Sequence, residues 1–152
     1  MAGTSAAPDS PPALSDRQFA LMLAMTMAMT ALAIDVMLPA FGEIREAMDL
    51  PADSSDTGAL ITVFFLGLAI AQIPAGLLAD RFGRKPVLHI GLVLYALGAV
   101  GTMFAPSLTW MLIGRFLWGL GAGGPRVVAV AIVRDRYAGD QMARMMSFVM
   151  AM

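Results

Sequence analysis

The sequence contains no cysteine and only one histidine, His89. Without cysteine the chain has no disulfide framework, no thiol chemistry and no Cys-ligated metal site. One histidine is too few for a His-ligated cluster, so we expect no metal site. Charged residues are scarce as well, at 14% against roughly 25% in soluble domains. A chain that is 59% hydrophobic cannot cover its surface with polar groups, which predicts a protein that lies in a lipid bilayer.

Four apolar runs are long enough to cross a membrane. Each has at least about 19 residues, which spans ~30 Å of hydrocarbon at ~1.5 Å per residue in a helix. They cover residues 19–41, 57–79, 87–105 and 108–133, and a fifth run starts near Met145. The sequence therefore predicts an all-α transmembrane protein with four complete helices and the start of a fifth. Pro74 and Pro125 are expected to bend their helices.

The segment before the first run is rich in alanine, serine and proline, and no basic residue precedes Arg17. The apolar run that follows is about 23 residues long, which exceeds the h-region of a signal peptide. We therefore expect residues 1–17 to form a disordered tail and not a cleaved signal.

The basic residues cluster on one side of the predicted helices. Seven of the ten lie in the tail, in the loop between the second and third spans, or after the fourth span: Arg17, Arg81, Arg84, Lys85, Arg134, Arg136 and Arg144. On the opposite side Arg45 stands among acidic residues. The positive-inside rule places the side with the basic cluster in the cytoplasm, so the N-terminus and the second-to-third loop are predicted to be cytoplasmic.

That loop is a short charged turn between two long apolar runs. Residues 76–86 read Gly-Leu-Leu-Ala-Asp-Arg-Phe-Gly-Arg-Lys-Pro, with Gly76, Asp80, Arg81, Gly83, Arg84 and Lys85 as its glycines and charged residues. Gly83 permits a positive φ in a four- or five-residue reversal. Basic residues alone are common in cytoplasmic turns. Glycines and an aspartate at these spacings form a more specific pattern than a run of charged residues.

The charges at this end of the chain suggest contacts. Asp80 lies at the C-terminal end of the second helix, where the helix dipole disfavours an anion, so it needs a partner elsewhere. Asp135 follows the fourth helix on the same predicted side. We predict a salt bridge between Arg84 and Asp135.

Two ionisable residues, Asp35 and Arg115, lie inside apolar spans at a similar depth. Each costs roughly 2.5–3.5 kcal/mol at a helix centre, so each is expected to face a cavity or the other and not lipid. Both lie about 9–10 Å below the same membrane surface. A pair between them could serve packing alone, or could hold a proton- or cation-binding carboxylate beside an arginine.

Arg126 follows Arg115 by 11 residues, which returns it to within about 20° of the same helix face. Gly119 lies near this stripe. The face is predicted to line a water-filled path, although Arg126 could instead reach the cytoplasmic interface by snorkelling. Small residues also recur at four-residue spacing on the second span (Gly67, Ala71, Ala75 and Ala79) and are frequent in the fourth. Close helix packing explains most of these small residues.

Three parts of the chain resemble one family. The Gly-x-x-x-Asp-Arg-x-Gly-Arg-Lys loop is similar to the signature loop of the major facilitator superfamily, between the second and third transmembrane helices. Residues 33–40, with Asp-x-x-Leu-Pro-Ala, and the Arg-Phe-Leu-Trp-Gly and Arg-Asp-Arg-Tyr segments from Arg115 and Arg134 resemble the Bcr/CflA multidrug-resistance group of drug:proton antiporters. Residues 18–152 would then be the incomplete N-terminal half of such a transporter, part of its first six-helix bundle.

The resemblance implies alternating access driven by the proton gradient, with no other cofactor. Asp35 and Arg115 would couple protons to the substrate, and the loop with Asp80 and Arg84 would stabilise the outward-facing state. In the family the aspartate at the position of Asp80 meets the eleventh helix, which lies outside this chain. Where the family often has glutamine, three residues after the arginine, this chain has Trp118.

The predicted function is proton-coupled efflux of drug-like molecules across a bacterial-type inner membrane, as part of a longer chain. The expected partners are the lipid bilayer, protons, a small-molecule substrate and the C-terminal helices of the same transporter. Two alternatives are a proton symporter for a nutrient or metabolite, and a truncated membrane fragment that does not transport. We expect no enzyme activity and no nucleic-acid partner, because the sequence has no nucleophile–base set, phosphate-binding loop or soluble domain.

Overall fold

A computed structural model of the chain describes residues 16–51, 55–136, 142 and 147. This part of the chain is helical and contains no strand. The helices are α1 (Asp16–Asp35), α2 (Met37–Ala47), α3 (Asp56–Phe82), α4 (Arg84–Met103) and α5 (Leu108–Arg136). Four segments are long and apolar enough to cross a membrane, and the first combines most of α1 with α2. The predicted all-α transmembrane class is confirmed.

Most helix ends lie outside the predicted apolar runs, although α4 ends at Met103, two residues before the predicted end. Because α1 begins at Asp16, both Asp16 and Arg17 belong to a helix and not to the predicted tail. Residues 1–15 lie outside the described part of the chain, as does most of the predicted fifth run, from which Ser147 alone is described. Charged residues are good helix formers, which is why hydropathy alone missed the charged first and last turns of these helices.

The first span is interrupted at Val36, between α1 and α2. Pro39, in the first turn of α2, has no N–H to donate to the carbonyl of Asp35, and its ring clashes with a carbonyl four residues earlier. These two effects account for the break. Pro74 and Pro125 lie within α3 and α5, which continue through them as single helices.

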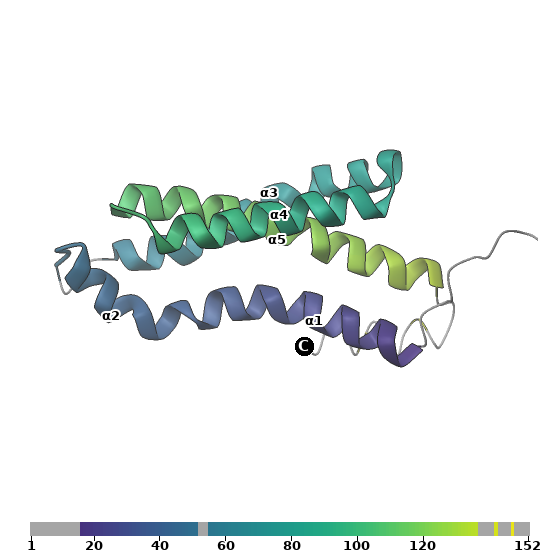
Figure 1. The fold of residues 1–152 in the computed structure, drawn as a ribbon, viewed down its shortest axis with the longest axis horizontal. Helices are drawn as coiled ribbons and strands as arrows, with labels where there is room; N and C mark the ends of the chain where they lie inside the picture. The colour runs from purple at the N-terminus through teal and green to yellow at the C-terminus, as the bar shows by residue number, and fades with distance from the viewer. Residues whose placement is uncertain (1–15, 52–54, 137–141, 143–146, 148–152) are drawn as a thin grey trace, which may run out of the picture.

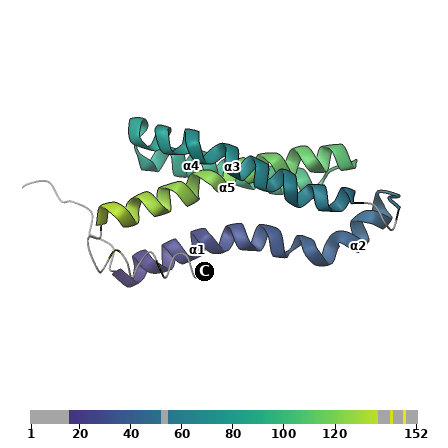
Figure 2. The same cartoon turned by 180° about the vertical axis from the view of Figure 1, so that it is seen from behind.

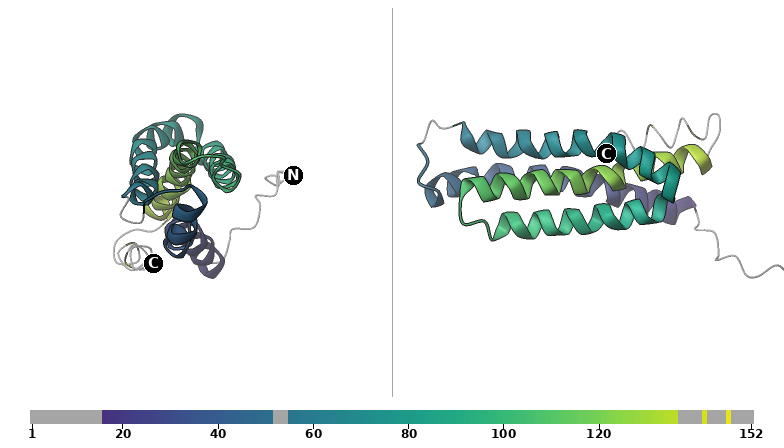
Figure 3. Two further views of the ribbon diagram at one scale, coloured as in Figure 1. Left: turned by 90° about the vertical axis from the view of Figure 1, so that its left-hand side faces the viewer. Right: turned by 90° about the horizontal axis from the view of Figure 1, so that it is seen from above.

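Helix α5 lies between α3 and α4, and α1 and α2 run along the other side of α5 (Figures 1 and 2). The view from above shows α5 flanked by its two neighbours (Figure 3, right). Apolar clusters join these layers, and one of them packs Leu23 and Met27 of α1 against Ala129 and Val133 of α5. Many large apolar side chains on the outer faces are exposed, as a helix that contacts lipid requires.

Glycines bring α5 into backbone contact with both neighbours. A Cβ added at Gly119 would lie 2.1 Å from the carbonyl oxygen of Phe64, and one added at Gly67 would lie 2.3 Å from that of Phe116. On the other side of α5, a Cβ at Gly121 would lie 2.1 Å from the amide nitrogen of Tyr95. Small residues thus permit the close helix approach expected in a membrane.

The interpretation of the small-residue ladder as packing is confirmed, since Gly67, Ala71, Ala75 and Ala79 are all buried. The prediction that Gly119 lines a path is wrong. Gly119 is buried against α3, because its missing side chain leaves the space that the α3 backbone occupies.

Candidate functional site: a buried arginine at the break in the first span

Arg115 is the most deeply buried charged side chain among the described residues, with 2% of its surface exposed. It projects from α5 toward α1, where its Nη1 donates a hydrogen bond of 2.8 Å to the carbonyl oxygen of Ala33. Ala33 lies in the last turn of α1, and carbonyls there lack the amide partner that a continuing helix supplies. The break before α2 therefore provides the acceptor that this buried guanidinium uses.

The predicted pair between Asp35 and Arg115 is not formed. Asp35 lies only two residues beyond Ala33, so the predicted similarity in depth holds, but its side chain is exposed and contacts no arginine. Successive residues turn by 100° along a helix, so positions 33 and 35 point about 200° apart. Arg115 approaches the side of α1 that carries Ala33, and the carboxylate of Asp35 points elsewhere.

Aromatic side chains surround the guanidinium. The Cζ atom of Arg115 lies 4.7 Å from the ring centroid of Trp118, a cation–π contact. The Trp118 ring meets Tyr95 edge-on at 5.5 Å and Phe64 at 6.3 Å between centroids. The hydroxyl of Tyr95 donates a 2.7 Å hydrogen bond to the carbonyl of Met29, one turn before Ala33. Helices α4 and α5 thus each donate a hydrogen bond to the backbone of α1.

The sequence analysis missed the role of Tyr95 and treated Trp118 only as a departure from a family pattern. The spacing of Arg115 and Trp118, three residues apart on one helix, predicts contact between them. No comparable signal exists for Tyr95, because its contact with Met29 joins residues that are 66 positions apart.

Among the described residues, the buried Nε of Arg115 has no hydrogen-bond partner. Buried polar groups are nearly always paired, so this donor indicates an acceptor outside the described residues. The cluster thus places a buried positive charge next to aromatic rings, between α1, α4 and α5.

Arg126 lies farther along α5 and is half-buried. Within the described residues it has no hydrogen-bond or ion-pair partner. Its neighbours along the same helix face the first span, since Ala122 packs with Ala33 and Ala129 packs with Met27. The lining of a path by Arg126 stays a prediction.

The signature loop is a turn at a single residue. Gly83, with φ 88° and ψ 166°, is the only residue between α3 and α4, whereas we had expected a reversal of four or five residues. Asp80 and Arg81 belong to α3, and Arg84 and Lys85 start α4. One residue with unusual dihedral angles is enough to reverse the chain direction here. The charged residues on both sides of Gly83 therefore remain helical.

The predicted contact between Arg84 and Asp135 is present as an ion pair on the surface. The other charged side chains of the loop, Asp80, Arg81 and Lys85, are exposed. Asp80 has no ion-pair partner among the described residues. Gly76 is half-buried, and a Cβ there would meet only Val127, at 3.9 Å.

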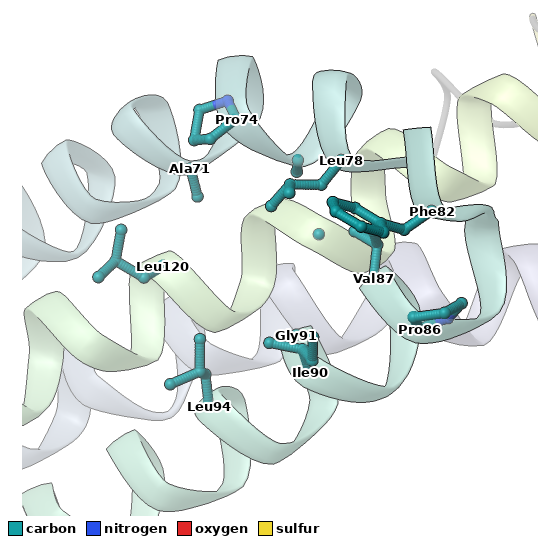
Figure 4. Close-up of a pocket in the computed structure, with 12 residues that line it drawn as sticks. Ala71, Pro74, Leu78, Phe82, Pro86, Val87, Ile90, Gly91, Leu94 and Leu120 are labelled. Atoms are coloured by element: carbon teal, nitrogen blue, oxygen red, sulfur yellow. The ribbon is translucent and has the colours of Figure 1, made fainter. Parts of the chain in front are cut away.

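An apolar groove of about 550 Å³ lies between α3 and α4, over α5 (Figure 4). Its walls include Pro74, Leu78 and Phe82 from α3, and Pro86, Ile90 and Leu94 from α4. None of the lining residues is titratable, so the groove offers no proton-transfer or metal chemistry. Over the described residues, no group of acidic or histidine side chains could hold a metal ion.

Comparison with known proteins identifies the family. The sequence profile of the Major Facilitator Superfamily matches residues 18–152. The chain belongs to the major facilitator superfamily. The predicted resemblance is confirmed, and it covers the helices that hold Asp35 and Arg115 as well as the signature loop.

Three relatives illustrate which known transporters are similar to this chain. The multidrug resistance protein MdtL of Escherichia coli is 41% identical over 105 residues, which is 69% of this chain and 27% of MdtL. The niacin transporter NiaP of Acinetobacter baylyi is 39% identical over 103 residues, 68% of this chain and 24% of NiaP. The uncharacterized MFS-type transporter YdgK of Bacillus subtilis is 35% identical over 131 residues, 86% of this chain and 32% of YdgK.

The chain thus spans about a quarter to a third of the length of these relatives. Its described residues include four helices long and apolar enough to cross a membrane, and the chain belongs to the major facilitator superfamily.

Proposed function

We propose that this chain is part of a transporter that exports small drug-like molecules in exchange for protons, by alternating access. The similarity to MdtL, whose name describes multidrug resistance, supports this substrate class. The proton gradient supplies the energy, and Asp35 and Arg115 form the coupling site at the break between α1 and α2.

The observation that carries the proposal is the place of Asp35. It ends α1 inside an apolar, membrane-length segment, and its carboxylate is exposed. A carboxylate that faced lipid at this depth would cost roughly 2.5–3.5 kcal/mol, so it faces a water-filled path formed with the rest of the transporter. Its neighbour Ala33 accepts the hydrogen bond of Arg115, so movement of α1 at the break changes the surroundings of both charges.

The test uses the full-length transporter in everted membrane vesicles that hold an acid interior. Addition of a transported drug to the wild type dissipates the pH gradient, because protons leave as the drug enters. Asp35→Asn should abolish this response while the protein still inserts in the membrane. Glu43→Gln is the matched control, since Glu43 is an exposed carboxylate of the same span that lies beyond the break, on α2. Wild-type coupling in Asp35→Asn would refute the proposal.

Uptake of a nutrient with protons is the second candidate, and it is supported by the similarity to the niacin transporter NiaP. Direction of transport separates the two functions. In proteoliposomes with an imposed proton gradient, an antiporter moves its substrate against the flow of protons, and a symporter moves it with them.

We also propose that the protein lies in a bacterial-type inner membrane with the N-terminus and Gly83 on the cytoplasmic side. The basic residues Arg81, Arg84 and Lys85 support this orientation. Asp80, exposed beside the turn, would then meet a helix of the transporter beyond this chain. A cysteine introduced at the exposed Lys85, next to the turn, should react with a membrane-impermeant maleimide in everted vesicles and not in intact cells, and the reverse result would overturn the orientation.

A further inference from the structure

We propose that the groove between α3 and α4 binds an acyl chain of an anionic phospholipid, and that the phosphate of this lipid binds Arg81. The lipid belongs to the leaflet whose surface lies at the turn of Gly83. This inference goes beyond the proposed function, because neither the cargo nor the coupling of protons enters it.

The groove is lined by apolar side chains along its whole length. Ala75 and Gly91 are buried at its floor, and Leu78, Phe82 and Ile90 are exposed along its walls (Figure 4). None of its lining residues has a polar side chain. A polar molecule would lose its hydrogen bonds to water on entering the groove and would find no partners there. A hydrocarbon chain has none to lose, so it fits this lining.

The groove has the length of one leaflet of a bilayer. Ala71 precedes Phe82 by 11 residues, which is about 16 Å along α3, or half of the ~30 Å of hydrocarbon. Phe82 and Pro86 lie at the end next to the turn, and Ala71 and Leu94 lie at the other end (Figure 4). A transmembrane helix packed here would need a groove along a whole span of about 20 residues. A groove of half that length fits an acyl chain of one leaflet.

A positive charge lies at the surface end of the groove. The Cζ atom of Arg81 is 5.4 Å from the ring centroid of Phe82, and this ring forms part of the groove wall. Arg81 is exposed and forms no ion pair with a described residue, whereas Arg84 is paired with Asp135. A basic residue that is exposed at a membrane surface attracts anionic lipids. The groove and Arg81 together therefore match both parts of an anionic phospholipid.

The neighbouring carboxylate of Asp80 lies on the other side of α3. Asp80 is two residues from both Leu78 and Phe82, and two residues correspond to about 200° around a helix. The charge beside the groove is therefore that of Arg81, whose guanidinium can donate two parallel hydrogen bonds to a phosphate. A zwitterionic phospholipid carries its own cation next to the phosphate. That cation competes with Arg81, so the site favours a lipid with a net negative charge.

The test measures lipid contacts of the full-length transporter in phosphatidylcholine nanodiscs. A small fraction of the lipid is photoreactive, either phosphatidylglycerol or phosphatidylcholine, with the same diazirine-labelled acyl chain. Mass spectrometry measures the yield of cross-links at Leu78 and Ile90, which lie on the two helices that form the groove. We expect a yield about five-fold higher with phosphatidylglycerol, as one basic residue beside an anionic lipid provides. High salt should reduce this ratio, because it screens exposed charges.

Three variants assign the preference to Arg81. Arg81→Gln removes the charge and should lower the ratio of the two yields to about one. Arg81→Lys keeps the charge and should retain most of the preference. Arg134→Gln is the matched control, since Arg134 is an exposed arginine near the same end of the bundle, on α5, and does not line the groove. Its ratio should equal that of the wild type.

Equal yields from the two lipids in the wild type would mean that the groove takes any lipid, and would overturn the proposal. Absence of cross-links from both lipids at Leu78 and Ile90 would mean that another part of the transporter covers the groove, which overturns it as well. An unchanged ratio in Arg81→Gln, or an equal loss in Arg134→Gln, would exclude Arg81 as the binding residue.

The nanodisc assay separates this proposal from the proposed export function. It uses no proton gradient, and both leaflets have the same composition, so neither the coupling of protons nor the orientation of the protein enters the result. Asp35→Asn should keep the preference for phosphatidylglycerol even where it abolishes proton-coupled efflux. Loss of the lipid preference in Arg81→Gln would likewise leave the assignment of Asp35 untouched.

Discussion

Arg84 and Asp135 join the first residue of α4 to the end of α5 through an ion pair. The two residues lie 51 positions apart in the sequence, and the contact ties the single-residue turn at Gly83 to the helix that carries Arg115. The pair therefore joins the signature loop to α5 about 20 residues beyond Arg115.

Asp135→Asn should loosen this loop with little effect on global stability. Both side chains of the pair are partly exposed, so its loss should change the free energy of unfolding by less than about 1 kcal/mol. Maleimide labelling of a cysteine introduced at Lys85 should become faster, and transport slower. The exchanged pair Arg84→Asp with Asp135→Arg should restore both. An unchanged transport rate and labelling rate in Asp135→Asn would refute the role of the pair.

Gly83→Ala should destabilise the connection between α3 and α4. With φ 88° and ψ 166°, Gly83 occupies a backbone region that is essentially restricted to glycine, and a residue forced into it costs about 1–3 kcal/mol. The measurement is the midpoint of thermal unfolding of the full transporter in detergent. Gly101→Ala, at an open position in α4, is the control and should not lower it. Equal midpoints for the two variants would contradict the assigned strain.

Gly119→Ala should be destabilising for a different reason. The added methyl group would lie 2.1 Å from the carbonyl oxygen of Phe64, so α3 and α5 must move apart, at a cost of about 1–3 kcal/mol. The same replacement at Gly101 meets nothing within 4 Å and improves helix propensity. Melting midpoints of the two variants check this prediction, and a Gly119→Ala protein as stable as Gly101→Ala would show that the helices are not in backbone contact.

Tyr95→Phe should weaken the attachment of α1 to the other helices. The variant keeps the ring contact with Trp118 and removes the hydrogen bond to the carbonyl of Met29, which is worth about 0.6–1.7 kcal/mol in a membrane. Amide hydrogen exchange should become faster in α1, around Met29, and stay the same in α3. Equal exchange rates of the α1 amides in the wild type and in the variant would mean that this hydrogen bond does not hold α1.

Much of the fold was predictable because it depends on local patterns. Four apolar runs separated by charged turns specify four membrane helices, since a backbone in lipid must satisfy its hydrogen bonds within each segment. The break between α1 and α2 was not predicted, although its cause, Pro39, is local. Bends were predicted only at Pro74 and Pro125. Those two lie inside helices that continue through them.

The candidate site was predicted only in part, because the sequence does not show which side of each helix faces its neighbour. Depth along a helix follows from residue count, so Asp35 and Arg115 were correctly expected at one level. Which side of α1 faces α5 is set by packing, and the packing directs Arg115 to the carbonyl of Ala33 and leaves Asp35 exposed. Every residue has a backbone carbonyl, so the residue type does not indicate which carbonyl accepts a hydrogen bond from a distant side chain.

The sequence alone determined the membrane class and the apolar spans, because these depend on composition and on the length of apolar runs, and its motifs indicated the superfamily by resemblance. The Arg84–Asp135 contact was predicted from charges on one side of the membrane, and the structure contains it. Only the tertiary structure decided which small residues pack and which charges meet. Gly119 lies against α3, Tyr95 reaches α1, and Arg115 donates to the backbone of Ala33, since these outcomes depend on how helices distant in sequence rotate and approach one another.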